Sequence, residues 1–222
     1  MLEEEAIKKG IELEKLKEEQ KKFSKLISLD DKINFSNANR FAGIDIQGLK
    51  DNKLIVAISI LDENNNLVEE KYSLGKPRFP YIPGFRAYRE LQIILDAYNK
   101  LEEGADIFFI EAQGLTHPRG LGLASHLGLR IDKPVIAIST EISEGGLKKP
   151  GDFISKGNKK IAQRIITKEE SNPIYVGIGH NISLKSAVEL TKKLIVFPHK
   201  LPEPIILARK FAKKAKKELE IK

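Results

Sequence analysis

The chain has 222 residues, enough for one sizeable hydrophobic core and too few for two comfortable domains, so we predict a single domain over residues 1–222. Cysteine is absent, which excludes disulfides, thiol nucleophiles and cysteine metal sites and leaves any catalysis to oxygen and nitrogen groups. The net charge of +7 suits a polyanionic partner. The same composition also fits the Lys- and Glu-rich surface of a heat-adapted protein.

We expect no membrane-spanning segment and no export signal in this sequence. Its N-terminus is acidic, with three glutamates in the first five residues. No apolar stretch approaches the roughly 20 residues that a membrane helix needs. We therefore expect a soluble, cytoplasmic and monomeric protein without a membrane partner.

The first part of the chain predicts one helix followed by three strands. Residues 2–27 have spaced apolar positions among many Lys and Glu, which predicts an amphipathic N-terminal helix. Short apolar runs at 41–46, 54–61 and 67–74 predict consecutive antiparallel strands, with a polar turn at 62–66.

The second part alternates helix and strand. Apolar periodicity predicts helices at 85–101 and 121–129, strands at 106–110 and 134–138, a hairpin of 161–167 with 173–178, and helices at 183–194 and 204–219. Residues 148–152 and 155–158 indicate a loop. This order predicts an α/β fold: a ribonuclease H-like mixed sheet over residues 40–210, with three antiparallel strands and then parallel strands, flanked by helices and closed by the basic helix 204–219.

Two carboxylates interrupt or end strand-like runs. Asp45 lies inside the first strand and Glu111 closes the fourth. An unpaired carboxylate is costly to bury, so each needs a cation, a donor cluster or a metal. In the ribonuclease H-like order these strands are neighbours, about 4.8 Å apart, so the pair could bracket one Mg²⁺ or a close pair of ions. The alternative pairs each acid with a lysine.

Two longer segments stand out: FPYIPGFRAYRE at 79–90 and QGLTHPRGLGLASHLG at 113–128. Both resemble the signature segments of endonuclease V, the enzyme that nicks DNA near deaminated purines, chiefly hypoxanthine. The resemblance extends from Phe41 to about Lys210, including residues 179–184 and 201–204.

This resemblance implies roles for three acids and a cofactor. Asp45 matches the first metal-binding aspartate of the family, and Glu111 stands where the second one stands. Glu90 matches the acid that organises the metal-bound water. The implied cofactor is Mg²⁺, with Mn²⁺ as the alternative.

The resemblance also implies a base-binding wedge. Tyr81 matches the tyrosine that separates the strands and closes the pocket around the extracted base, in a turn completed by Pro80, Ile82, Pro83 and Gly84. Two prolines and a glycine suit a protruding turn. In the second segment, Gly114 would let the backbone approach the purine, and His117 either holds the loop or touches the substrate. The implied partner is DNA with deaminated bases, and inosine-containing RNA is the alternative.

Three positions depart from the family pattern. Glu111 replaces an aspartate and pushes the carboxylate out by about 1.5 Å, Thr140 stands where a lysine is common, and Arg209 stands where the family has a histidine or an acid near the metal. A guanidinium would pair with carboxylates instead of ligating Mg²⁺. Two hypotheses stay open: a Mg²⁺-dependent endonuclease of DNA repair, or a non-cutting protein that binds deaminated or branched nucleic acid. The distance from Arg209 to the two carboxylates discriminates between them.

Overall fold

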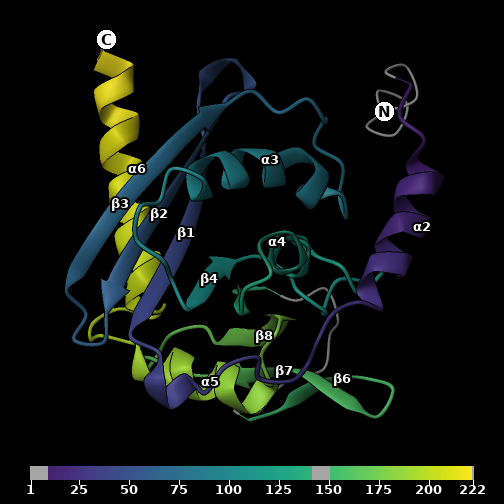
Figure 1. Cartoon of the computed structure of the whole chain (residues 1–222), viewed down its shortest axis with the longest axis vertical. Helices are drawn as coiled ribbons and strands as arrows, with labels where there is room; N and C mark the ends of the chain where they lie inside the picture. The colour runs from purple at the N-terminus through teal and green to yellow at the C-terminus, as the bar shows by residue number, and fades with distance from the viewer. Residues whose placement is uncertain (1–9, 142–150, 222) are drawn as a thin grey trace.

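One mixed sheet of eight strands runs through the protein in a computed structural model that describes residues 10–141 and 151–221. The strand order is β3-β2-β1-β4-β5-β8-β7-β6 (Figure 1). The strands are β1 Arg40–Gly48, β2 Leu54–Asp62, β3 Leu67–Gly75, β4 Ile107–Glu111, β5 Val135–Ser139, β6 Phe153–Lys156, β7 Lys159–Ile165 and β8 Ile174–His180. The pairs β1–β4 and β4–β5 are parallel and the other pairs are antiparallel, which confirms the predicted α/β sheet with its three leading antiparallel strands.

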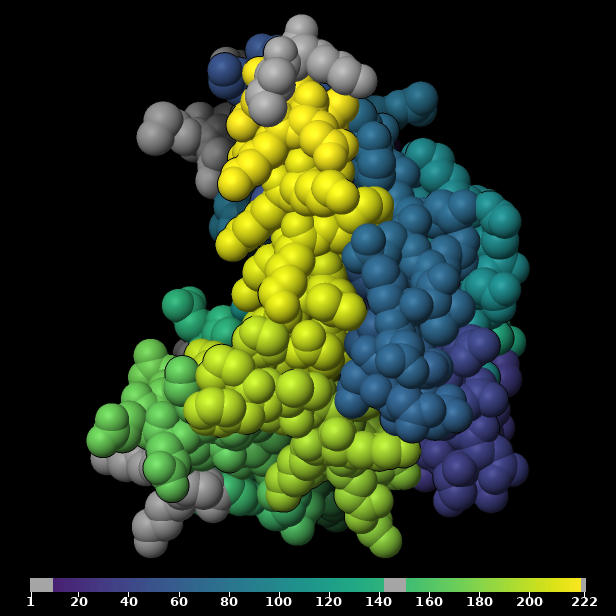
Figure 2. Space-filling view, turned by 90° about the vertical axis from the view of Figure 1, so that its left-hand side faces the viewer, coloured from purple at the N-terminus to yellow at the C-terminus, as the bar shows by residue number. Residues whose placement is uncertain are grey.

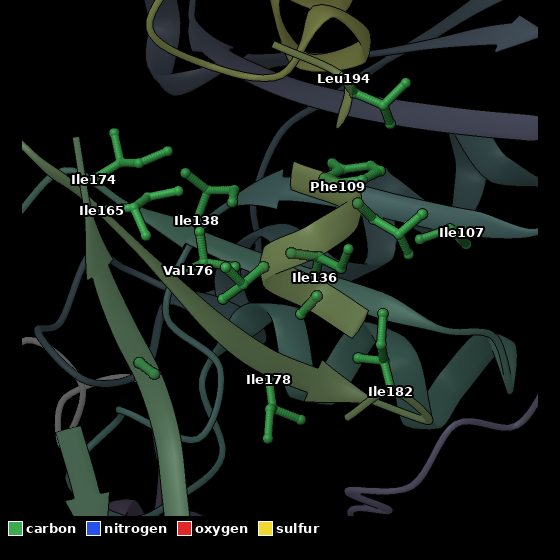
Figure 3. Packing of buried hydrophobic residues seen from close by; sticks show 14 of the residues in the cluster. Ile107, Phe109, Ile136, Ile138, Ile165, Ile174, Val176, Ile178, Ile182 and Leu194 are labelled. Atoms are coloured by element: carbon green, nitrogen blue, oxygen red, sulfur yellow. The ribbon is translucent and has the colours of Figure 1, made fainter. Parts of the chain in front are cut away.

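Helices cover both faces of this sheet. They are α2 Leu13–Ser24, α3 Arg86–Tyr98, α4 Leu123–Ile131, α5 Leu184–Lys193 and α6 Glu203–Ile221. Helices α3 and α4 pack on one face, and α5 and α6 on the other (Figure 1). Because strand side chains alternate between faces, the strands feed two separate hydrophobic cores. Figure 3 shows the core on the α5 side, where Phe109, Ile136 and Ile178 lie among other aliphatic side chains.

The N-terminal helix differs from its prediction. Of the expected span 2–27, the described helix covers Leu13–Ser24, and residues 1–9 lie outside the described part. Gly10 has a φ of 68°, a left-handed conformation that interrupts a right-handed helix. The apolar periodicity continues through this point, so periodicity alone gave too long a helix.

The loop expected at 155–158 is wrong, because it is part of a β-hairpin. Strand β6 pairs antiparallel with β7, and Gly157 has the positive φ of 59° at the turn between them. Only Ile154 of β6 is buried, so the strand has almost no hydrophobic pattern that the sequence could reveal. Residues 148–150 lie outside the described part.

Helix α6 runs along the surface of the molecule beside β1 and β2 (Figure 2). Its N-terminal part is buried against the sheet, whereas its C-terminal part carries exposed lysines. None of the described helices is long and apolar enough to cross a membrane.

Candidate functional site

The sheet places Asp45 and Glu111 next to each other. Ile44 of β1 is in register with Ile110 of β4, so the residues that follow them are neighbours across a parallel pair. Both isoleucines belong to the core on the α3 side. Alternation therefore directs Asp45 and Glu111 to the opposite face, beneath α6. The predicted juxtaposition of the two acids is confirmed.

Helix α6 then brings a guanidinium to these acids. A Cβ on Gly43 would overlap the backbone carbonyl of Pro204, so glycine allows the first turn of α6 to lie directly on β1. Further along the helix, Arg209 donates from Nε to Asp45 Oδ1 at 3.2 Å and from an amino group to Glu111 Oε2. Arg209 thus bridges both carboxylates.

The outer carboxylate oxygens also have donors. Gln47 donates to Asp45 Oδ2 at 2.9 Å, and the Thr140 hydroxyl donates to Glu111 Oε1 at 3.2 Å. Burial acts to lower the pKa of Arg209, but the Glu111 and Asp45 carboxylates outweigh it and raise that pKa above its ordinary value. Arg209 therefore keeps its positive charge within the bridge.

This arrangement does not fit a divalent metal ion. Mg²⁺ requires oxygen ligands at about 2.1 Å in near-octahedral geometry. The space between the inner oxygens of Asp45 and Glu111 holds the Arg209 side chain instead. In residues 10–141 and 151–221, no three His, Asp or Glu side chains converge on a point where an ion could bind. With Arg209 in place, one of the two negative charges of the pair is balanced from within the protein.

Glu90 forms an ion pair with Arg86, a residue that the sequence patterns did not single out. Glu90 is buried on α3, where Arg86 Nε donates to its Oε2 at 2.7 Å. Burial raises the pKa of Glu90, and the Arg86 charge opposes that rise. A second Arg86 nitrogen donates to the Glu111 backbone carbonyl at 3.1 Å. The spacing of four residues on a predicted helix was the signal that could have paired Arg86 with Glu90.

Two adjoining cavities surround these groups. The acidic cleft, of about 340 Å³, is lined by Asp45, Glu111, Thr140 and Arg209 among others. The second cavity, of about 480 Å³, is lined by residues of the turn 80–84, named the wedge turn, and by residues of the loop 113–123. We name it the base cavity after the role that the sequence resemblance implies for these residues. The two cavities share three lining residues: Arg86, Gln113 and Glu141.

The wedge turn forms one wall of the base cavity. Tyr81 is 59% exposed at its tip, whereas the neighbouring Ile82 is buried in a small cluster with Phe79 and Phe85. Gly84 adopts a φ of 79°, which only glycine tolerates easily. The lining residues include the predicted Tyr81, Ile82, Pro83, Gly84 and His117.

Two other predicted base-binding residues lie outside the cavity lining. Pro80 is buried beneath the turn. Gly114 is explained by packing, because a Cβ there would overlap the backbone carbonyl of Ile178 on β8. Gly122 of the same loop lines the cavity.

A buried glutamine ties the two walls of the base cavity together. Gln20 of α2 donates to the carbonyl of Gly84 at 3.1 Å and to that of Leu121 at 3.2 Å, and it accepts from Arg119 Nε at 2.5 Å. Arg119 also donates to the Gly84 carbonyl at 2.7 Å. Gln20 was not among the residues predicted from the sequence. A glutamine in an apolar position of an amphipathic helix was the available signal.

His117 belongs to the same network. One ring nitrogen lies 3.0 Å from the Gly84 carbonyl and the other accepts from the Arg119 backbone N–H at 3.2 Å. Burial, with the nearby charge of Arg119, lowers the pKa of His117 to about 4. The ring is therefore neutral at pH 7 and holds the turn through hydrogen bonds.

Comparison with known proteins identifies the family. The sequence profile of the family described as Endonuclease V matches residues 21–210. The chain belongs to the endonuclease V family. An endonuclease V of Thermosipho melanesiensis is 37% identical over 216 residues, which cover 95% of this chain and 91% of the relative.

Solved structures of endonuclease V share this fold. The protein from Bacillus subtilis superposes with a TM-score of 0.87 at 25% identity, covering 94% of both chains. That from Ciona intestinalis, in complex with a 24mer DNA containing an inosine followed by a ribo-adenosine, superposes with a TM-score of 0.84 at 22% identity, covering 93% of this chain and 98% of that one. The ribonuclease H-like fold predicted from the sequence is therefore confirmed.

The endonuclease V match includes Arg209 as well as both carboxylates. The Arg209 bridge therefore lies within the family domain and not in an appended tail.

Proposed function

We propose that this endonuclease V-family chain recognises nucleic acid that carries a deaminated purine and holds the altered base in the base cavity. One observation carries the proposal: the base cavity opens directly beside the acidic cleft, with Arg86, Gln113 and Glu141 common to both. A base bound in the first cavity would bring its own backbone to the second. Extraction of a base costs least where its pairing is already weak.

The lining of the base cavity suits a purine. It offers the Gln113 amide and backbone groups of the wedge turn, which can exchange hydrogen bonds with a base edge, while the neutral His117 ring holds the turn. The exposed Tyr81 ring can stack in the gap that the base leaves. We take DNA as the partner, because the Ciona endonuclease V was solved with inosine-containing DNA. Inosine-containing RNA is the alternative.

Recognition of an altered base does not require that the chain also nicks the strand. The family activity implied by the sequence is Mg²⁺- or Mn²⁺-dependent nicking through Asp45, Glu111 and Glu90. We propose instead that the chain binds without metal-dependent cutting while Arg209 bridges the carboxylate pair, because all the oxygens of that pair already have protein donors. Nicking is the second candidate function, and membership of the endonuclease V family favours it.

One experiment tests both parts. Binding of the purified protein to a duplex with a single inosine is compared with binding to the matched undamaged duplex, and cleavage is followed across a range of Mg²⁺ and Mn²⁺ with an active family enzyme in parallel. We expect a preference of about tenfold or more for the damaged duplex and no nicking. Equal binding to both duplexes would refute recognition, and nicking would refute the non-cutting part alone. Competition with inosine-containing RNA then decides the natural partner.

The wedge role has its own variant. Tyr81→Ala should reduce the preference for the damaged duplex more than it reduces general affinity, because the ring fills the space of the extracted base. Phe197→Ala, which removes an aromatic ring that is 87% exposed elsewhere, is the matched control. Equal losses on both duplexes would remove the wedge role from Tyr81.

A further inference from the structure

We infer that Arg209 is the resident cation of the acidic cleft, that it excludes divalent ions from the Asp45–Glu111 pair, and that its removal would turn this pair into a divalent-cation site. The inference rests on the proposed function and deepens it, since it explains why recognition would proceed without metal-dependent cutting. Its test reads metal binding directly and needs no nucleic acid.

The charges carry the first step. Asp45 and Glu111 together bring two negative charges to one edge of the sheet, and Arg209 cancels one of them. Arg86 is the other cation among the described residues lining the cleft, and it is bound to the Glu90 carboxylate and the Glu111 carbonyl. Without Arg209, the two carboxylates on adjacent strands would therefore face each other with no cation of their own.

Hydrogen-bond geometry carries the second step. Arg209 binds the inner oxygens, Asp45 Oδ1 and Glu111 Oε2. Gln47 and Thr140 bind the outer ones from the sides. Removing the guanidinium would expose the two inner oxygens while the outer contacts still orient both carboxylates. This is the arrangement that a divalent cation with oxygen ligands requires.

The carboxylate pair is also within reach of solvent. The side chains of Arg209 and Glu111 are 33% and 31% exposed, whereas that of Asp45 is only 10% exposed. An ion could thus reach the pair through the cleft once the guanidinium is gone. In the wild type, the Arg209 side chain of α6 occupies this position in the cleft.

The test is a Mn²⁺ titration followed by electron paramagnetic resonance of the free ion. We expect Arg209→Gln to bind Mn²⁺ at least about tenfold more tightly than the wild type, because a positive charge at contact distance opposes the ion. Lys213→Gln is the matched control, since it removes one exposed positive charge one turn further along the same helix and should leave Mn²⁺ binding unchanged. Adding Asp45→Asn to Arg209→Gln should abolish the gain.

Two results would overturn the inference. One is wild-type Mn²⁺ binding that Asp45→Asn abolishes, which would mean that the ion shares the pair with Arg209. The other is a folded Arg209→Gln variant, verified by circular dichroism, that gains no Mn²⁺ affinity. If that variant does not fold, Arg209→Met replaces it, since methionine keeps an apolar stem of similar length and removes the charge. The same gain in Mn²⁺ affinity is then expected, and no gain refutes the inference. Lesion binding measured with chelator present stays independent of every outcome.

Discussion

The base cavity and the acidic cleft share three lining residues, yet they differ in whether their polar groups already have hydrogen-bond partners in the protein. Around the base cavity, Gln20 and Arg119 fix the walls through hydrogen bonds, whereas the Gln113 amide, which also lines the cavity, has no side-chain hydrogen bond within residues 10–141 and 151–221. In the acidic cleft, Arg209 and its neighbours already bind the oxygens that would do chemistry.

The comparison teaches that recognition and cutting are structurally separable on this fold. The walls of the base cavity depend on α2, the wedge turn and the loop 113–123. The state of the acidic cleft depends on one side chain of α6. A change at Arg209 therefore alters the cleft without touching the network that shapes the base cavity.

The largest expected effect comes from rebuilding the acidic cleft on the family pattern. The triple variant Glu111→Asp, Thr140→Lys and Arg209→His removes the bridge and supplies the residues that the family carries at these positions. We expect Mn²⁺-dependent nicking of an inosine duplex on the order of a hundredfold above the background strand breakage seen with the wild type, since a metal bound at the rebuilt pair would stabilise developing charge by several kcal/mol. The same triple variant with Asp45→Asn is the control. A folded triple variant that binds Mn²⁺ and the lesion but leaves the strand intact would show that the cleft lacks more than these three residues.

Next in size is the loss of Gln20, which should damage the base cavity and spare the cleft. Gln20→Leu keeps the apolar volume but leaves the Leu121 carbonyl and the Arg119 Nε without this partner and removes one of the hydrogen bonds to the Gly84 carbonyl. We expect a loss of about 2 kcal/mol in the free energy of unfolding and a loss of most of the preference for the damaged duplex. Chemical denaturation and duplex binding measure the two effects.

Glu18→Leu, on an exposed position of the same helix, is the matched control. Full retention of lesion preference in a folded Gln20→Leu protein would mean that the cavity walls hold their places without this residue.

A smaller effect concerns pH. His126 of α4 packs between the rings of Phe23 and Tyr88 at centroid distances of 5.9 and 5.7 Å, and burial lowers its pKa from 6.5 to about 4. Between these values the unfolded chain takes up the proton and the folded chain does not, so the free energy of unfolding should fall as the pH drops from 6.5 toward 4. Denaturant midpoints measured across this range test the direction.

His126→Phe should reduce the loss of unfolding free energy between pH 6.5 and pH 4 by about 1–2 kcal/mol, because the aromatic packing stays while the titrating group is lost. His117, whose pKa is also about 4, contributes with the same sign and accounts for a remaining slope. If the free energy of unfolding of His126→Phe falls with pH as steeply as that of the wild type, groups other than His126 cause the loss of stability in acid.

The smallest expected effect concerns general affinity. Lys213, Lys214, Lys216 and Lys217 continue α6 beyond Arg209. Changing all four to Gln should flatten the plot of log affinity against log salt by about 0.9 for each phosphate that these lysines neutralise, on damaged and undamaged duplex alike. Lys192→Gln with Lys193→Gln on α5 is the control. The same slope in all three proteins would show that the α6 lysines neutralise no phosphate.

Local sequence predicted most of the fold and half of the site. The strand-like runs placed Asp45 on the first strand and Glu111 at the end of the fourth, and the ribonuclease H-like strand order predicted that these two strands are neighbours. The segment 79–90 predicted a protruding turn with Tyr81 at its tip, because prolines and glycine restrict the backbone locally. Strand β6, with one buried residue, had too little pattern to be detected.

The sequence by itself determined which chemical groups the two cavities contain. Only the tertiary structure decided which of them are free. Arg209 and Asp45 are 164 residues apart, and Gln20 and Leu121 are 101 apart, so their pairing depends on how α6 and α2 dock on the sheet. That docking follows from packing over many residues, such as the contact of Pro204 with Gly43, and no local pattern encodes it.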